Sequence, residues 1–98
     1  MKIFDVELKQ LQVGSLKIEI HRSPQAAGEA AARAVAGSLL DLAARKSSVG
    51  VIFATGASQL ATLQALTAMP DVPWGQVAGF HMDEYLGIAP EHPASFRG

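Results

Sequence analysis

The hydrophobic and polar positions of this chain change their spacing several times, and each spacing predicts an element. Residues 16–21 alternate apolar and polar side chains, as a half-buried strand does. Residues 1–11 alternate more weakly and fit either an edge strand or a loose arm. Gly14 and Ser15 indicate a turn between the two segments. The beginning of the chain is therefore expected to contain at least one strand.

A long helix is predicted next. Ser23 is a good N-cap, and Pro24 is tolerated at the first helical position, where its missing N–H would be unpaired anyway. Residues 27–42 carry small and apolar side chains at helical spacing, and Arg45 and Lys46 suit a last turn. Because many side chains on that face are small, we expect the helix to lie close against a sheet.

The second half of the chain predicts two more strands and one more helix. Residues 49–54 form a continuous apolar run, which is typical of a strand buried on both faces. A helical pattern over residues 58–69 follows, and residues 76–82 indicate another short buried strand. Strands that alternate with crossover helices predict an α/β fold, with an open, mostly parallel, Rossmann-like sheet and helices on both faces.

Composition bounds the class of protein. The chain has 98 residues, of which 49% are hydrophobic and 17% charged, so it is expected to fold, as one domain at most. A net charge of −1 gives no electrostatic case for binding nucleic acid or an anionic membrane surface. The absence of cysteine excludes disulfides and cysteine-based zinc sites. With no signal-peptide pattern and no apolar run of membrane-spanning length, a soluble cytoplasmic protein is expected.

One candidate binding segment follows the strand at 49–54. In folds of this class, ligands bind beyond the carboxyl ends of the strands. Thr55, Gly56, Ala57 and Ser58 stand there, and small residues let the backbone approach a ligand closely. The N–H groups at the start of the following helix suit a phosphate. An ordinary tight turn with Ser58 as the helix N-cap fits the same residues.

A second candidate segment follows the strand at 76–82. It contains His81, Asp83, Glu84 and Tyr85. A carboxylate at a strand end, partly shielded from water, can abstract a proton next to a carbonyl. The alternative is a strand end whose polar residues face solvent, with Tyr85 as a core anchor. His81 lacks a second histidine at ligand spacing, which favours a structural or supporting role over metal binding.

Three segments, "FATGASQLATLQAL", "PWGQVAGFHMDEYLGI" and "EHPASFRG", resemble the N-terminal part of the glucosamine-6-phosphate deaminase/isomerase family. That family has a Thr-Gly-rich turn after a buried strand, then Met-Asp-Glu-Tyr, then Glu-His-Pro-x-Ser-[Phe/Tyr]. The resemblance covers residues 49–98 closely. It implies an aldose–ketose isomerisation with loss of ammonia, which turns glucosamine 6-phosphate into fructose 6-phosphate without a metal or other cofactor.

The resemblance also implies residue roles. Asp83 corresponds to the general base that moves a proton between C2 and C1. The turn at 55–58 corresponds to the phosphate-binding turn, Tyr85 lies beside the sugar pocket, and Glu84 has a supporting role. The implied substrate-binding residues are therefore Thr55, Gly56, Ala57, Ser58, Glu84 and Tyr85, and no metal site is implied.

The chain departs from the family pattern in two ways. The commoner turn is Thr-Gly-Gly-Thr-Pro, and Ala57 replaces the second glycine, which leaves the exact sugar open. The family's second half carries an Asp-x-His segment, a nearby Glu and basic phosphate ligands, none of which residues 1–98 supply. We therefore expect the chain to be the N-terminal part of a single deaminase/isomerase-like domain and to be inactive alone.

Two other functions fit some of the same residues. A 6-phosphogluconolactonase shares the fold and the phosphate turn, but it more typically has Asp-Glu-Arg where this chain has Asp83, Glu84 and Tyr85. A non-catalytic, sugar-phosphate-sensing domain of a transcription regulator would need a basic helix-turn-helix, which these residues do not show. The expected partner is a small-molecule sugar phosphate, not nucleic acid or membrane, and a homo-oligomer is left open.

Overall fold

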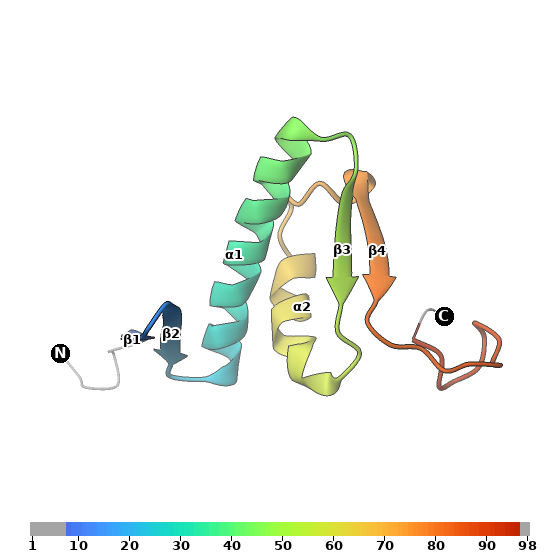
Figure 1. Cartoon of the computed structure of the whole chain (residues 1–98), viewed down its shortest axis with the longest axis horizontal. Helices are drawn as coiled ribbons and strands as arrows, with labels where there is room; N and C mark the ends of the chain where they lie inside the picture. Colours follow the sequence, from blue (N-terminus) through green and yellow to red (C-terminus); the bar gives the residue numbers. More distant parts are fainter. Residues whose placement is uncertain (1–7, 97–98) are drawn as a thin grey trace.

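The computed structural model describes residues 8–96 as an α/β chain. The α/β class predicted from the sequence is confirmed. The elements are β1 (Leu8–Val13), β2 (Leu16–His21), α1 (Pro24–Arg45), β3 (Val49–Phe53), the 3₁₀ turn η2 (Ala57–Gln59), α2 (Leu60–Thr67), the 3₁₀ turn η3 (Trp74–Gln76) and β4 (Val77–His81). Figure 1 shows the hairpin of β1 and β2 on the N-terminal side, then α1, then α2, and the strand pair of β3 and β4 beyond α2.

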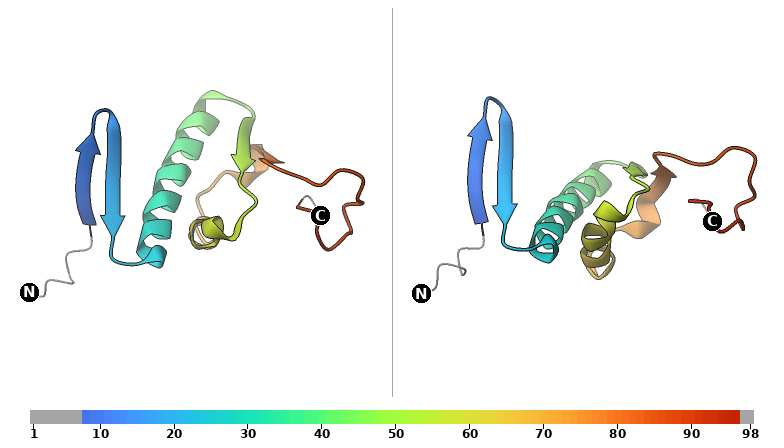
Figure 2. Two further views of the ribbon diagram at one scale, coloured as in Figure 1. Left: turned by 60° about the horizontal axis from the view of Figure 1, so that its bottom comes forward. Right: turned by 90° about the horizontal axis from the view of Figure 1, so that it is seen from below.

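The hairpin forms a sheet of its own. β1 pairs antiparallel with β2, with Leu8 opposite His21. The turn predicted at Gly14 and Ser15 is confirmed: Gly14 has a φ of 60°, which glycine adopts without strain. The hairpin stands apart from β3 and β4, with the helices between them (Figure 2). It therefore does not extend the parallel sheet. The expectation for residues 1–7 lies outside the described residues.

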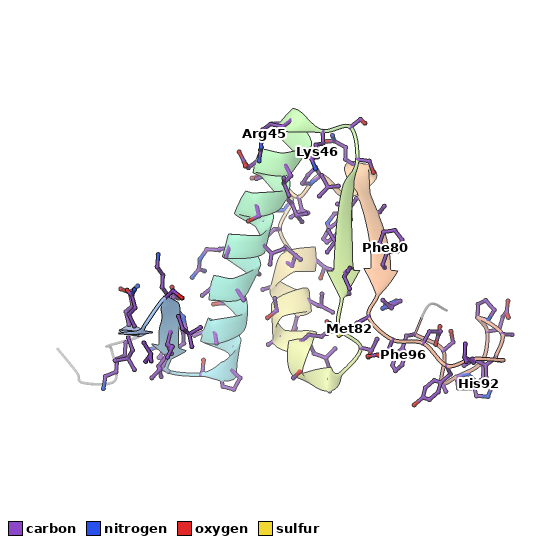
Figure 3. The ribbon with its side chains drawn as sticks, viewed as in Figure 1. Arg45, Lys46, Phe80, Met82, His92 and Phe96 are labelled. Atoms are coloured by element: carbon purple, nitrogen blue, oxygen red, sulfur yellow. The ribbon has the colours of Figure 1, made fainter. Side chains whose placement is uncertain are left out.

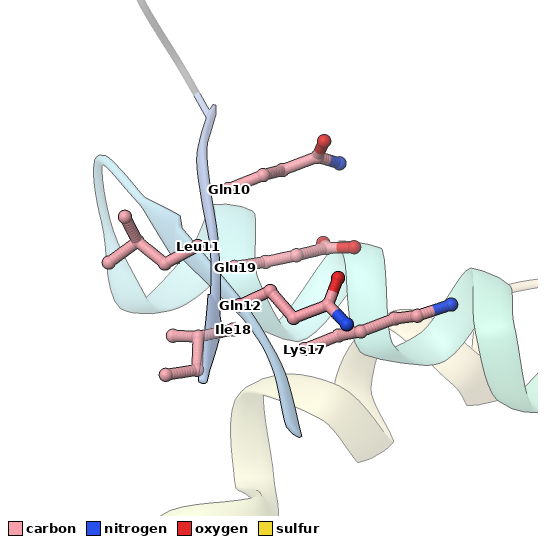
Figure 4. Close-up of a pocket in the computed structure, with 6 residues that line it drawn as sticks. All are labelled: Gln10, Leu11, Gln12, Lys17, Ile18 and Glu19. Carbon is pink, nitrogen blue, oxygen red and sulfur yellow. The ribbon is translucent and has the colours of Figure 1, made fainter. Parts of the chain in front are cut away.

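One face of the hairpin is apolar and the other is polar. Directly opposed residues share a face, so Leu11 lies with Ile18, and Gln12 lies with Lys17. Figure 4 shows Leu11 and Ile18 pointing to one side, and Gln10, Gln12, Lys17 and Glu19 pointing to the other. Within residues 8–96 most of the apolar face is left uncovered. Its exposed apolar side chains are Leu11, Val13, Leu16 and Ile20.

Both ends of α1 are capped by side chains. The Ser23 hydroxyl oxygen accepts a hydrogen bond of 3.0 Å from the Ala26 N–H, which confirms the predicted N-cap. At the other end, the Gln76 side-chain amide donates to the carbonyl oxygens of Ala43 and Lys46, both at 3.2 Å. Ala43 lies in the last turn and Lys46 is the C-cap, and carbonyl groups at a helix end have no partners inside the helix. Gln76 thus ties the start of β4 to the end of α1.

The small residues of α1 allow a close approach to α2. A Cβ atom built on Gly28 would lie 2.7 Å from the carbonyl carbon of Ala61, so only glycine fits there. The sequence led us to expect the sheet as the close neighbour, whereas the closest approach is to α2, which lies directly beside α1 (Figures 1 and 2). The buried core nevertheless joins both helices to β3; it consists of Ala32, Ala36, Leu39, Val49, Leu66 and Val72.

β3 and β4 pair in parallel, as the sequence predicted, with Val49 opposite Val77. Within residues 8–96 both helices lie on one side of this pair (Figure 1). Val49 is buried beneath them, whereas Ile52 and Phe80 on the opposite face are 69% and 58% exposed. The prediction that residues 49–54 are buried on both faces is therefore wrong for the described chain. The helices expected on the second face are not among its elements.

Candidate functional site

The two candidate segments lie at the same end of the β3–β4 pair. Because the strands are parallel, their carboxyl ends are adjacent, and β3 leads into residues 54–59 while β4 leads into residues 82–96 (Figure 1). The Met82 N–H donates to the Phe53 carbonyl oxygen at 2.8 Å, which continues the pairing beyond β4. The fold thus brings together two segments that the sequence places far apart.

A direct hydrogen bond joins the two segments. The Thr55 hydroxyl donates to Oδ2 of Asp83 at 3.2 Å. Thr55 is half-buried, and Asp83 is exposed to solvent. The carboxylate is therefore oriented by the turn while it stays accessible to a small molecule.

The turn after β3 begins its helix without a side-chain cap. Gly56 is the N-cap of η2 and Gln59 is the N-cap of α2, and neither makes a side-chain cap hydrogen bond. The interpretation with Ser58 as N-cap is therefore wrong. The Gln59 side-chain amide instead donates to the Ala54 carbonyl oxygen and closes the turn. Helix N-termini without side-chain caps are suited to binding an anion.

Neither packing nor backbone conformation explains the glycine at position 56. Its φ is −84°, which any residue adopts. A Cβ atom there would meet only the Ser58 hydroxyl oxygen, at 3.9 Å, which is an ordinary contact. Gly56 is exposed, so a side chain at this position would project from the surface of the turn.

The segment after β4 folds back on itself without forming a helix or a strand. Gly87 has a φ of 76° and lies in the turn that reverses the chain. The returning chain meets Glu84: Oε2 accepts from the Ser95 hydroxyl at 2.9 Å, and Oε1 accepts from the Phe96 N–H at 3.0 Å. The end of the segment is thereby held beside its beginning.

Three aromatic rings gather at this place. Phe96 stacks on Tyr85 with ring centroids 5.7 Å apart and an angle of 18° between the rings. The His81 ring lies 6.5 Å from Phe96, at an angle of 46°. Tyr85 is 56% exposed, so the alternative of a core anchor is wrong within the described chain. The sequence assigned no role to Ser95 or Phe96, although the third segment of the resemblance contains them.

Arg45 and Lys46, the two adjacent cations that precede β3, lie at the opposite end of the strand pair from the candidate site. Figure 3 shows Arg45 and Lys46 at the end of α1, opposite the end where Met82 and Phe96 lie. An anion bound at the turn would therefore meet N–H groups and hydroxyls but not these two side chains.

Two kinds of site are absent from the described part of the chain. Residues 8–96 contain no group of three or more His, Cys, Asp and Glu side chains that could hold a metal ion. Neither α1 nor α2 combines the length and the apolar character that crossing a membrane requires.

Curated relatives carry the name that the three sequence segments suggest. The chain is 46% identical over 46 residues to the glucosamine-6-phosphate deaminase of Vibrio cholerae serotype O1, a match that covers 44% of this chain and 17% of the relative. It is 38% identical over 72 residues to the glucosamine-6-phosphate deaminase of Hahella chejuensis, covering 70% of this chain and 28% of the relative. The resemblance to the glucosamine-6-phosphate deaminases is confirmed.

This resemblance extends over only part of the relatives. The chain spans 17% to 28% of the length of the deaminases from these two organisms. No protein-family model matches the chain, and no solved structure gives a significant match. The likeness to the deaminases therefore rests on the curated relatives and on the residues of the site.

Proposed function

We propose that the protein carrying this chain is a glucosamine-6-phosphate deaminase/isomerase, which releases fructose 6-phosphate and ammonia. The observation that carries the proposal is the hydrogen bond from Thr55 to Asp83. It joins a turn suited to a phosphate with a carboxylate suited to moving a proton. The names of the curated relatives support the same reaction class.

In this proposal Asp83 is the general base. Its carboxylate takes the proton from C2 of the open-chain sugar and returns it to C1, while a proton passes from the amine to O1, so that the amino aldose becomes the isomeric ketimine. Water then adds to the imine, and ammonia leaves. Because Thr55 already donates to Oδ2, the carboxylate needs little reorientation before it reacts. The reaction as written needs no metal or cofactor.

The phosphate is proposed to bind at the turn formed by Thr55, Gly56, Ala57 and Ser58. The N–H groups at the starts of η2 and α2 have no side-chain caps, and Gly56 keeps the approach open. The exposed ring of Tyr85 would lie beside the sugar. We expect a cation to complete the site, and Arg45 and Lys46 are too remote to supply it (Figure 3). A cytoplasmic location is part of the proposal, because the chain has no cysteine.

The test is to supply glucosamine 6-phosphate to the intact protein and to measure ammonia and fructose 6-phosphate. We expect the two products in equal amounts. Hydrolysis of 6-phosphogluconolactone without ammonia release would overturn the proposal in favour of a lactonase. Binding of sugar phosphates without turnover of either substrate would favour a sensor domain instead.

Residues 1–98 expressed alone are expected to be inactive and poorly soluble. The described part of the chain leaves Ile52, Phe80 and Met82 exposed on one face of a two-stranded sheet, and both edges of that pair are open. Ammonia release and sedimentation measure the two properties. A monomer that released ammonia as fast as the intact protein would contradict this expectation.

A further inference from the structure

Glu84 is the residue around which the segment after β4 is organised. Besides the bonds from Ser95 and Phe96, its Oε1 accepts a hydrogen bond of 3.0 Å from the N–H of Tyr85. The two bonds to the returning chain are partly buried and span 11 and 12 positions. Hydrogen bonds to an ionised carboxylate are roughly twice as strong as neutral ones.

These bonds hold the end of the segment beside its beginning. They bring the ring of Phe96 onto Tyr85 and beside His81. Glu84 also follows Asp83 directly, so it fixes the backbone on one side of the carboxylate that Thr55 holds. Beyond the bond from Met82 to Phe53, the described residues of this segment make short turn bonds, such as Ser95 N–H to the His92 carbonyl, and form no helix or strand.

We propose that Glu84 is a positioning residue that shapes the site without touching the substrate. Its carboxylate holds the chain at Ser95 and Phe96 by hydrogen bonds, and we call this arrangement the clamp. The clamp fixes the orientation of Tyr85 and restricts the motion of the backbone at Asp83. This inference deepens the proposed function and rests on it for its effect on turnover. The clamp itself can be measured without any substrate.

Two substitutions separate positioning from direct action on the substrate. In Glu84→Gln the amide oxygen can still accept from both backbone N–H groups, and the amide NH₂ can donate to the Ser95 hydroxyl. Glu84→Ala loses all three bonds. If Glu84 acted on the substrate through its negative charge, both variants would lose turnover equally. If Glu84 acts as a clamp, Glu84→Gln keeps the hydrogen bonds and most of its effect.

The experiment measures amide hydrogen exchange of residues 84–96 in the intact protein without substrate, followed by kcat and KM for glucosamine 6-phosphate. In Glu84→Ala we expect the Phe96 amide to exchange about 10-fold faster or more. Turnover should fall about 10- to 100-fold, because the reacting groups lose their alignment. Glu84→Gln should give a clearly smaller change than Glu84→Ala in both measurements, because its amide keeps the bonds but not the charge that strengthens them.

Two further variants complete the test. Ser95→Ala removes one bond of the clamp and should give intermediate exchange, which keeps the inference testable if Glu84→Ala does not fold. The control is Asp71→Ala, which removes an exposed carboxylate outside both segments and should change neither exchange nor turnover.

The outcomes distinguish this inference from the proposed function. Unchanged exchange in Glu84→Ala and in Ser95→Ala would overturn the clamp. Equal loss of turnover in Glu84→Gln and Glu84→Ala, with normal exchange in the glutamine variant, would show that Glu84 acts on the substrate. The expected exchange pattern in a protein that releases no ammonia would support the clamp and overturn the proposed function.

Discussion

The segments that follow β3 and β4 reach the same corner of the molecule, but different forces shape them. Residues 54–59 form a short turn between a strand and a helix that are both packed into the core. Residues 82–96 form a longer excursion held by hydrogen bonds to Glu84 and by one pair of stacked rings. The first segment is fixed at both ends by elements that pack into the core. The second depends on a few polar contacts near solvent.

This difference suggests a division of tasks. Binding a phosphate requires backbone N–H groups in a fixed arrangement, which the packed turn can supply. Proton transfer and sugar recognition require side chains that meet the substrate, and the excursion carries Asp83 and Tyr85. Three variants, each with a control, test this division; they follow in order of decreasing expected effect.

The largest effect is expected for Asp83→Asn. The amide keeps the shape of the side chain and can accept the bond from Thr55, but it cannot take a proton from C2. In the intact protein kcat should fall by on the order of 10²–10⁴, while KM changes far less because the turn is untouched. The control is Asp71→Asn, an exposed carboxylate outside both segments. Near-normal turnover in Asp83→Asn would show that Asp83 is not the general base.

A smaller effect, on binding alone, is expected for Gly56→Val. The structure has room for a Cβ atom at this exposed position, so we expect the variant to fold, but the valine would block an anion from the turn. The KM for the sugar phosphate and the inhibition constant of inorganic phosphate should rise about 10- to 100-fold, with kcat little changed. Gly75→Val is the control, since its Cβ meets nothing within 4 Å. An unchanged inhibition constant of inorganic phosphate in Gly56→Val would show that the anion does not bind at this turn.

The smallest effect on turnover is expected for Gly28→Ala, which tests the packing of α1 against α2, the helix that follows the turn. Its Cβ would press against the backbone of Ala61 in the first turn of α2. We expect a loss of about 1–3 kcal/mol in the free energy of unfolding, measured by denaturant titration of the intact protein. The matched variant Gly37→Ala has open space and should gain about 0.5–1 kcal/mol. A neutral Gly28→Ala would show that the two helices are not in close contact.

Much of the local structure could be predicted because neighbouring residues determine it. The Ser23 cap and the turn at Gly14 were predicted correctly, and the strand expected over residues 49–54 is β3, Val49–Phe53. Cap chemistry and apolar spacing depend on residues a few positions apart, so the sequence contains the necessary information. The order of strands and helices also predicted that the segments around Thr55 and Asp83 would each follow a strand end.

The individual contacts of the site could not be predicted in this way. Nothing in the sequence indicated that Thr55 would donate to Asp83, or that Glu84 would hold Ser95 and Phe96. These contacts depend on the path of an irregular segment through its turns, and no simple periodicity describes such a path. The roles that the resemblance implies for Asp83 and the turn residues remain predictions.

The sequence by itself therefore determined the identity of the elements, their order and the residues that stand at the strand ends. Only the tertiary structure showed which part of the chain, or solvent, each apolar surface contacts. The small face of α1 contacts α2, and Ile52 and Phe80 are exposed because both helices lie on the other face of the strand pair. The physical reason is that apolar spacing tells which side of an element avoids water, whereas the surface that covers this side comes from distant parts of the chain.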